Sequence, residues 1–345
     1  MVVSVHARRM QVILAGDTGG AKTVLALYSR ERGVAAGSLH ETRFKSGKYS
    51  SLEAIIVDFL RETKAKPVAA SFGVAGPVRG RRAQITNLPW VIDAQSVGDA
   101  FGIDHVYLLN DLQSIATAVP HLRQDDVVTL NPGLPVEHGN IAVIAPGTGL
   151  GIGFLVWAGA GYRAYPSEAG HTSYAPQNLQ EMELLKYLQR RYGHVSFERV
   201  CSGRFLPNIY DFLHEQRSHL EPQWLQEELA AASDRTPVIV QAALEQKADI
   251  CSAALDIFIH SLGTICGNMA VTLLATGGIY LGGGIPPRIV KRLQVPDFLS
   301  AIRDKGRFSG FCSDLPVHVI QDPKVALRGA AWFGLEALAR RGGPA

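Results

Sequence analysis

Two segments of the chain repeat one pattern, in which a short apolar run breaks into a turn rich in glycine and threonine and then returns to apolar sequence. The segments are QVILAGDTGGAKT, residues 11–23, and NIAVIAPGTGLGIG, residues 140–153. Glycine lets a backbone take positive φ and lets a ligand approach closely. Successive N–H groups in such a turn form a concave nest for anions, phosphate above all. The repeat therefore predicts two α/β halves that face one polyphosphate.

Length and composition agree with two soluble halves. The chain has 345 residues, of which 47% are hydrophobic and 19% charged, and this suits two globular domains of about 150 residues each. A net charge of +3 gives no electrostatic case for a nucleic acid or a membrane surface, so we expect neither as a partner. The four cysteines contain no CxxC pair, which argues against structural zinc or disulfides and favours a reduced, cytoplasmic setting.

Strand-like and helix-like segments alternate, which indicates an α/β fold. We expect strands at residues 12–15, 24–28, 67–74, 83–87, 106–109, 141–144, 151–156, 279–281 and 316–320. We expect helices at residues 52–62, from Asp111 onward, at 179–192, over most of 238–276, and at 326–340. Residues 257–285 are apolar but contain many glycines, so they predict a buried helix, a turn and a strand rather than a membrane span. Polar residues and glycines gather where strands end, which is where open α/β sheets bind ligands.

The first turn carries groups that can hold phosphate oxygens. Its N–H groups and threonine hydroxyls supply donors, and Asp17 can hold Mg²⁺ through water, since that ion keeps much of its hydration. The GxxxxGK[ST] pattern of a Walker A loop is absent. The alternative is an ordinary hairpin, because DTGG is a good turn sequence. The residues of this candidate phosphate site are Gly16, Asp17, Thr18, Gly19, Gly20 and Ala21.

Two further glycine turns follow strand-like segments. Gly147, Thr148 and Gly149 form the second, and because residues 152–157 read as a strand rather than a helix, a dinucleotide-binding turn is disfavoured. The third is residues 282–284, where Gly283 and Gly284 can lie against the adenosine part of a nucleotide. A plain loop between a strand and a helix explains the third turn almost as well.

Asn110 and Asp111 stand at the end of a strand. Asp111 can take the proton from a hydroxyl that attacks phosphorus, while Asn110 donates to a neighbouring hydroxyl. The alternative is that Asp111 caps the helix that follows, as aspartate often does. The two readings are compatible.

Three more polar residues match a ligand with several adjacent hydroxyls. Glu168 and His171 lie together in the loop PSEAGH, and Glu198 lies in GHVSFERVCSG. Zinc is disfavoured because His171 has no second ligand at the usual spacing. For Glu198 the alternative is a solvated helix residue paired with Arg199.

Taken together, these segments resemble the bacterial glucokinase family, in the group without a cysteine-rich zinc motif. The resemblance rests on nine segments in order: GDTGGAKT, GVAGPV, ITNLPW, LLNDLQSIA, APGTGLGIG, PSEAGHTSYAP, GHVSFERVCSG, LGGGIPPR and DKGRFS. It implies a two-domain α/β fold of the hexokinase/actin-like, ribonuclease H-like type, with a ligand cleft between the domains. The small domain would comprise residues 1–121 and 325–345, and the large domain residues 122–324.

The resemblance also implies an activity, the transfer of the γ-phosphoryl group of ATP to the 6-hydroxyl of glucose with Mg²⁺, and a tendency towards homodimers. By the same resemblance Asp111 is the base. The sugar ligands would be Asn110, Asp111, Glu168, His171 and Glu198. The nucleotide ligands would be Gly16, Asp17, Thr18, Gly19, Gly20, Ala21, Gly147, Thr148, Gly149, Gly283 and Gly284.

Two departures from the family pattern bear on affinity. Ala21 stands where the family has threonine, so one hydroxyl contact to phosphate is missing unless Thr18 or Thr23 replaces it. Ala169 stands where the family has glycine, which could tighten the loop between Glu168 and His171. The alternatives are a kinase for another hexose or amino sugar, and a non-kinase actin-like ATPase or sugar sensor on the same fold.

Overall fold

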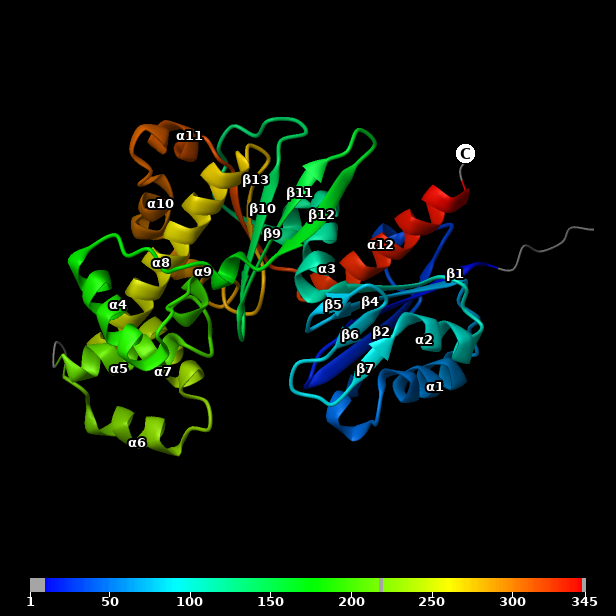
Figure 1. The fold of residues 1–345 in the computed structure, drawn as a ribbon, viewed down its shortest axis with the longest axis horizontal. Helices are drawn as coiled ribbons and strands as arrows, with labels where there is room; N and C mark the ends of the chain where they lie inside the picture. Colours follow the sequence, from blue (N-terminus) through cyan, green and yellow to red (C-terminus); the bar gives the residue numbers. More distant parts are fainter. Residues whose placement is uncertain (1–9, 217–219, 343–345) are drawn as a thin grey trace, which may run out of the picture. The chain divides into compact units, whose positions relative to one another are not determined.

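The computed structural model describes residues 10–216 and 220–342, and the chain divides into two compact units. The first unit takes residues up to Leu122 and from Pro323 onward, and the second takes Arg123–Asp322. Figure 1 shows the chain coloured along its sequence, so that the C-terminal helix α12 (Val325–Gly342), in red, can be followed back to the first unit. Each unit is built around its own sheet.

The sheet of the first unit has five strands in the order β3-β2-β1-β4-β8. Its strands are β1 (Val12–Thr18), β2 (Lys22–Ser29), β3 (His40–Lys45), β4 (Ala69–Val74) and β8 (Val106–Asn110). Strands β1, β4 and β8 are parallel, with Thr18 beside Val74 and Val74 beside Asn110. The C-terminal ends of β1 and β8 therefore lie at the same end of the sheet, on either side of β4. A separate three-stranded sheet contains β5 (Val78–Arg79), β6 (Arg82–Gln84) and β7 (Val91–Asp93).

Both faces of this sheet are covered, because its central strands are apolar along their whole length. Successive residues of β1 point to opposite faces: Leu14 joins the core beneath α1 (Leu52–Thr63) and α2 (Ala94–Phe101), whereas Ile13 and Ala15 join the core beneath α12. Helix α3 (Asp111–Ala118) packs against α12, as Figure 1 shows. The helix that begins at Asp111 is therefore held by a segment from the far end of the chain.

The sheet of the second unit has six strands in the order β12-β11-β10-β13-β14-β9. Its strands are β9 (Val127–Asn131), β10 (Ile141–Pro146), β11 (Leu150–Trp157), β12 (Tyr162–Ser167), β13 (Gly278–Leu281) and β14 (Val317–Ile320). Its helices are α4 (Leu179–Tyr192), α5 (Leu206–Glu215), α6 (Gln223–Ala231), α7 (Arg235–Leu244), α8 (Asp249–Leu273), α9 (Val290–Leu293), α10 (Pro296–Arg303) and α11 (Ser309–Ser313). Strand β10 pairs with β13 in parallel and with β11 antiparallel, so the turn after β10 lies next to the turn after β13.

Helix α8, drawn in yellow in Figure 1, is the central helix of the second unit. In length and composition it is apolar enough to cross a membrane, but 78% of its most apolar window is buried inside the protein. This matches the expectation of a buried helix, followed by a turn and strand β13. A core helix contacts protein on nearly all sides, which explains why it is apolar all round.

The expected elements and the observed ones differ where local sequence is ambiguous. Some elements agree with expectation. Helix α4 has the bounds expected for it. Helix α1 is capped by Ser51, whose Oγ accepts from the Ala54 N–H at 3.3 Å. The strand expected at residues 83–87 ends at Gln84, because the chain enters a turn in which Asn87 has a φ of 70°. Among the elements that the sequence analysis did not anticipate are β3, β5, β7, β9, β12, α2, α5, α6, α10 and α11.

Candidate functional site

The first glycine turn joins β1 to β2 and is tightly packed on its inner side. A Cβ on Gly16 would lie 2.5 Å from the Phe72 ring, and a Cβ on Gly20 would lie 3.0 Å from the carbonyl oxygen of Thr86. The Gly19 N–H is used within the turn, donating to the Lys22 carbonyl at 2.9 Å. Glycine is therefore required here for close packing.

Ser46, which the sequence analysis missed, holds this turn from behind. It is fully buried in a short 3₁₀ helix, Ser46–Lys48. Its hydroxyl donates to the Gly19 carbonyl at 2.7 Å, and its N–H donates to the Ala21 carbonyl at 3.3 Å. The only sequence signal was the Ser-Gly pair at positions 46 and 47, which marks a turn but no function.

The threonine hydroxyls of the first turn do not face a ligand, contrary to expectation. Thr18 and Thr23 are both fully buried. Thr18 Oγ1 has no hydrogen-bond partner, and Thr23 Oγ1 lies 3.0 Å from Ser46 Oγ. Neither hydroxyl replaces the one that Ala21 lacks. Within residues 10–216, no hydrogen bond is found for the N–H groups of Gly20 and Ala21, and these donors remain for an anion.

Two carboxylates flank the end of β4. Asp17 lies on β1, and its pKa is raised, mainly by burial and further by the negative charge of Asp111, while Lys22 opposes the shift. Asp111 is the first residue of α3 and is exposed to solvent. Its Oδ1 accepts from the Leu112 N–H at 2.9 Å. Asp17 pairs with Gly73 of β4, and Asn110, the residue before Asp111, pairs with Val74 of β4, so both carboxylates lie at the same end of the first unit's sheet.

Asn110, not Asp111, caps α3. Asn110 Oδ1 accepts from the Gln113 N–H at 2.6 Å, so the capping alternative considered for Asp111 is wrong. The helix behind them is fixed by close contacts, since a Cβ on Gly329 of α12 would lie 1.7 Å from the Ser114 carbonyl oxygen. Asp111 is thus carried on a helix whose position allows little adjustment.

In the second unit, Glu198 is attached to the second glycine turn. Its Oε2 accepts from the Leu150 N–H at 3.0 Å, and a Cβ on Gly149 would lie 2.7 Å from the same oxygen. The alternative of a solvated helix residue paired with Arg199 is wrong. The Arg199 guanidinium instead lies over the Tyr192 ring, 4.1 Å from its centroid.

The second and third turns lie side by side, because β10 and β13 are neighbours. Gly283 has a φ of 79°, and a Cβ there would lie 2.5 Å from the Pro146 carbonyl oxygen. The Ile285 N–H donates to that same oxygen at 3.2 Å. A Cβ on Gly147 would lie 4.0 Å from the Gly284 nitrogen. The two turns therefore form one continuous surface of backbone and glycine.

The loop PSEAGH is also joined to the second turn. Gly170 is buried, and a Cβ there would lie 2.1 Å from the Leu150 carbonyl oxygen. Glu168 Oε2 lies 3.8 Å from His171 Nε2, with side chains 84% and 61% exposed. Leu150 thus contacts Glu198 through its N–H and the PSEAGH loop through its carbonyl.

A short pairing of two segments connects the remaining candidates. The Phe197 N–H donates to the Thr172 carbonyl at 3.0 Å, and the Tyr174 N–H donates to the Val195 carbonyl at 2.9 Å. Residues 172–174 and 195–197, here called the paired segments, have His171 and Glu198 at one end. In the second unit, Glu168, His171 and Glu198 therefore lie close to the second and third glycine turns.

A resident metal centre made of protein ligands is not found. Across residues 10–216 and 220–342, no group of three or more His, Cys, Asp or Glu side chains is placed to hold a metal ion. Asp17 remains a single carboxylate, which suits an ion that keeps several waters and arrives with phosphate.

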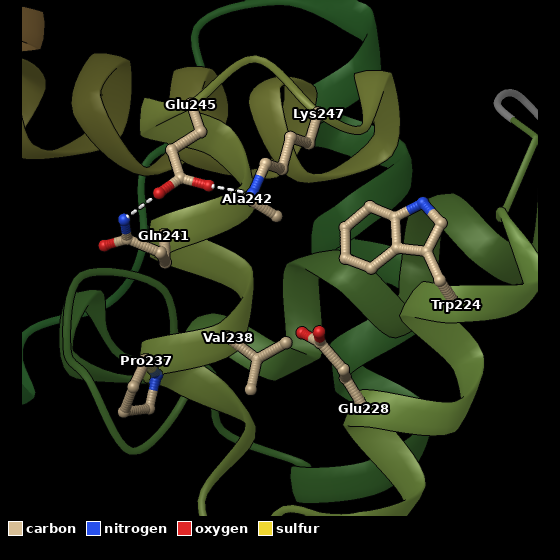
Figure 2. A pocket seen from close by; sticks show the side chains of 8 residues that line it. All are labelled: Trp224, Glu228, Pro237, Val238, Gln241, Ala242, Glu245 and Lys247. Carbon is tan, nitrogen blue, oxygen red and sulfur yellow. Dashed lines mark hydrogen bonds and ion pairs between the residues drawn. The ribbon is translucent and has the colours of Figure 1, made fainter.

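A separate hollow of about 830 Å³ lies between α6 and α7 (Figure 2). Trp224 and Glu228 line it from α6, and Val238 lines it from α7. At its rim the Glu245 carboxylate pairs with Lys247 at 2.6 Å. None of its lining residues is a candidate from the sequence, so we assign this hollow no role in the chemistry.

The family model and the curated relatives agree on one family. The family model described as Glucokinase matches residues 14–337. The chain is 35% identical over 335 residues to the glucokinase of Nostoc punctiforme, covering 93% of this chain and 98% of that one. It is 37% identical to the glucokinase of Chromobacterium violaceum, covering 96% and 92%. The crystal structure of a glucokinase from an Antarctic psychrotroph superposes with a TM-score of 0.84 at 29% identity, covering 95% of this chain and 100% of that one.

Proposed function

The chain belongs to the glucokinase family, and from this premise we infer that it transfers the γ-phosphoryl group of ATP to the 6-hydroxyl of glucose, giving glucose 6-phosphate and ADP. Nearly the full length of the chain matches curated glucokinases. The fold is the α/β fold of the hexokinase/actin-like type that the resemblance implied. The observation that carries the proposal within the molecule is the grouping of carboxylates and an imidazole beside glycine turns.

We propose that two sets of side chains bind the sugar hydroxyls. In the first unit these are Asn110 and Asp111, and in the second unit Glu168, His171 and Glu198. Carboxylates accept hydrogen bonds from hydroxyls, and an imidazole can donate or accept. Glu198 keeps one oxygen on the Leu150 N–H, which fixes the carboxylate while its other oxygen stays available to a hydroxyl.

We propose that backbone donors hold the phosphates of ATP. In the first unit they are the N–H groups of Gly20 and Ala21, with Lys22 exposed beside them. In the second unit they are the N–H groups of Thr148 and Gly149. The Gly147 N–H donates to the Gly149 carbonyl at 2.8 Å, so Gly147 would line the phosphates without donating, while Gly283 and Gly284 would lie against the nucleoside. Mg²⁺ would enter with ATP as part of the substrate, and Asp17 would hold it through water.

The chemical step requires one proton acceptor. The sugar 6-hydroxyl attacks the γ-phosphorus, the bond to the ADP oxygen breaks, and the hydroxyl proton passes to the Asp111 carboxylate. Asp111 is exposed at the start of α3, where the helix N-terminus favours the ionised form.

Initial rates of ADP formation with a panel of sugars and donors test the substrate assignment. We expect the highest kcat/KM for glucose with ATP. A clear preference for N-acetylmannosamine or fructose would instead favour the alternative of another hexose or amino-sugar kinase. ATP hydrolysis that no sugar stimulates would favour an actin-like ATPase.

We further propose a cytoplasmic setting and a homodimer. All four cysteines are free and buried, which agrees with a reducing compartment. The homodimer rests on the family resemblance, and light scattering of the purified chain tests it.

Replacing Ser46 with alanine is expected to weaken ATP binding. The change removes the hydroxyl that holds the Gly19 carbonyl and leaves the Thr23 hydroxyl without its partner. We expect KM for ATP to rise about 3- to 10-fold, with KM for glucose unchanged, since the net value of a hydrogen bond is about 1 kcal/mol. Steady-state kinetics check this. Ser50→Ala, at an exposed neighbour, is the control, and equal effects of both changes would refute the role of Ser46.

Replacing Asp17 with asparagine is expected to stabilise the fold while reducing activity. Because the pKa of Asp17 is raised from 3.8 in the folded protein, mainly by burial, its ionisation opposes folding above that pH. The stability that Asp17 contributes is therefore present below its unfolded pKa and is lost as pH rises through the folded pKa. Asparagine does not ionise. The melting temperature of Asp17→Asn minus that of the wild type should therefore increase from about pH 4 upward and level off above the folded pKa of Asp17.

Asp93 provides a control of opposite sign. Its pKa is lowered, mainly by the hydrogen bond from Arg82, so its contribution is present above the unfolded pKa and lost as pH falls. Asp93→Asn should lower the melting temperature at neutral pH. If both variants shifted the melting temperature in the same direction, the electrostatic account of Asp17 would be wrong.

A further inference from the structure

A buried acid and a histidine meet behind the sugar-binding loops of the second unit. The Glu181 side chain, on α4, is only 1% exposed. Its Oε1 lies 2.6 Å from Nδ1 of His260 on α8, and its Oε2 accepts from the Gln177 N–H at 2.8 Å. Both oxygens of the buried carboxylate are therefore occupied, as burial of a charged group requires.

The charges around His260 favour its protonated form. Its pKa is raised, first by the hydrogen bond to Glu181 and further by the negative charges of Asp297 and Asp304, while partial burial opposes the shift. A buried ion pair is weak evidence for stability, since desolvation offsets much of its attraction. The pair is therefore better explained as fixing the position of α4 relative to α8 than as adding to the stability of the fold.

Ser261, the residue after His260 on α8, connects the helix to the segments that carry the proposed sugar ligands. Ser261 Oγ lies 3.0 Å from the Tyr174 hydroxyl. Tyr174 is buried, and its ring meets Phe197 edge to face with centroids 5.5 Å apart. Tyr174 and Phe197 belong to the two paired segments, one on each side. Helix α8 thus holds both segments through one tyrosine.

The paired segments end at proposed sugar ligands. His171 directly precedes residue 172, and Glu198 directly follows residue 197. Between them the backbone bonds from Phe197 to Thr172 and from Tyr174 to Val195 fix the register, and a bridge joins Ser173 to Ser196. A shift of Tyr174 or of the start of α4 would therefore move His171 and Glu198 together.

We propose that Glu181 and His260 are positioning residues for sugar binding, which fix the start of α4 and the paired segments so that His171 and Glu198 meet the sugar hydroxyls. The inference rests on the proposed sugar role of His171 and Glu198. It assigns neither Glu181 nor His260 a contact with substrate. It requires that their loss affect the sugar and leave the nucleotide unaffected.

The test compares His260→Ala, His260→Gln and Glu198→Ala in the full chain. We expect His260→Ala to raise KM for glucose about tenfold, with KM for ATP within about twofold and kcat little changed, because it leaves a buried carboxylate without its partner. His260→Gln keeps an amide donor and should restore part of the glucose affinity. Glu183→Gln, at an exposed ion pair on the same helix, is the control and should change neither KM.

Three outcomes separate this inference from the proposed function. Glucose KM raised by both Glu198→Ala and His260→Ala, with partial rescue by His260→Gln, supports it. A lower melting temperature with unchanged glucose KM in His260→Ala, while Glu198→Ala raises that KM, shows a purely structural pair and overturns the inference alone. An unchanged glucose KM in Glu198→Ala overturns both the sugar role of Glu198 and this inference.

Discussion

Asp111→Ala is expected to reduce kcat by roughly 10²- to 10⁴-fold, the usual contribution of a general base, while glucose binding persists in part. Asn110 still caps α3 in this variant, and the contact between Gly329 and Ser114 still fixes the helix. The fold should therefore survive, and the loss should fall on proton transfer. Coupled measurement of ADP gives kcat, and calorimetric titration gives the affinity for glucose.

Asp104→Asn is the matched control, because Asp104 is an exposed carboxylate shortly before β8 in the same unit. It should leave kcat unchanged. Asp111→Asn should behave like Asp111→Ala, since an amide cannot accept the proton. Turnover at the wild-type rate in either Asp111 variant would show that another group is the base.

Gly170→Ala is expected to disrupt the sugar-binding loop. The added methyl group would lie 2.1 Å from the Leu150 carbonyl oxygen, and this neighbour is strand backbone rather than the end of a flexible side chain. We expect a loss of about 1–3 kcal/mol of stability from overpacking, and a rise of at least about tenfold in KM for glucose as Glu168 and His171 are displaced. Thermal unfolding and steady-state kinetics measure the two effects.

Two controls locate the effect at one position. Gly161→Ala adds the same methyl group where nothing lies within 4 Å, so it should change neither quantity. Ala169→Gly restores the residue that the family has, and we expect a change below about twofold, because position 169 is partly exposed. If Gly170→Ala bound glucose as tightly as the wild type, the loop would not depend on this contact.

Much of the fold could be predicted from local pattern. Apolar runs bounded by glycine located β1, β4, β10 and β13, and apolar spacing of three and four residues located α4 with its observed bounds. Strand β3, by contrast, has only Phe44 buried in a polar sequence, HETRFK, so its pairing with β2 is decided by tertiary contact rather than by propensity.

The chemistry of the site was less predictable than its location. The turn sequence indicated a phosphate site, but it could not show that Thr18 points inward or that Ser46 supports the turn from 27 residues away. Likewise, charge and spacing suggested Arg199 as the partner of Glu198. The true contact, the Leu150 N–H, is 48 residues distant. Contacts across such separations leave no local pattern.

The most direct test of the central claim is the identity of the phosphorylated product. The purified chain is incubated with glucose, ATP and Mg²⁺, and ³¹P NMR follows the reaction, with parallel samples that lack the sugar or the nucleotide. We predict glucose 6-phosphate and ADP in equal amounts, formed only in the complete mixture. Inorganic phosphate released at the same rate without glucose, or a phosphate on another hydroxyl, would contradict the account.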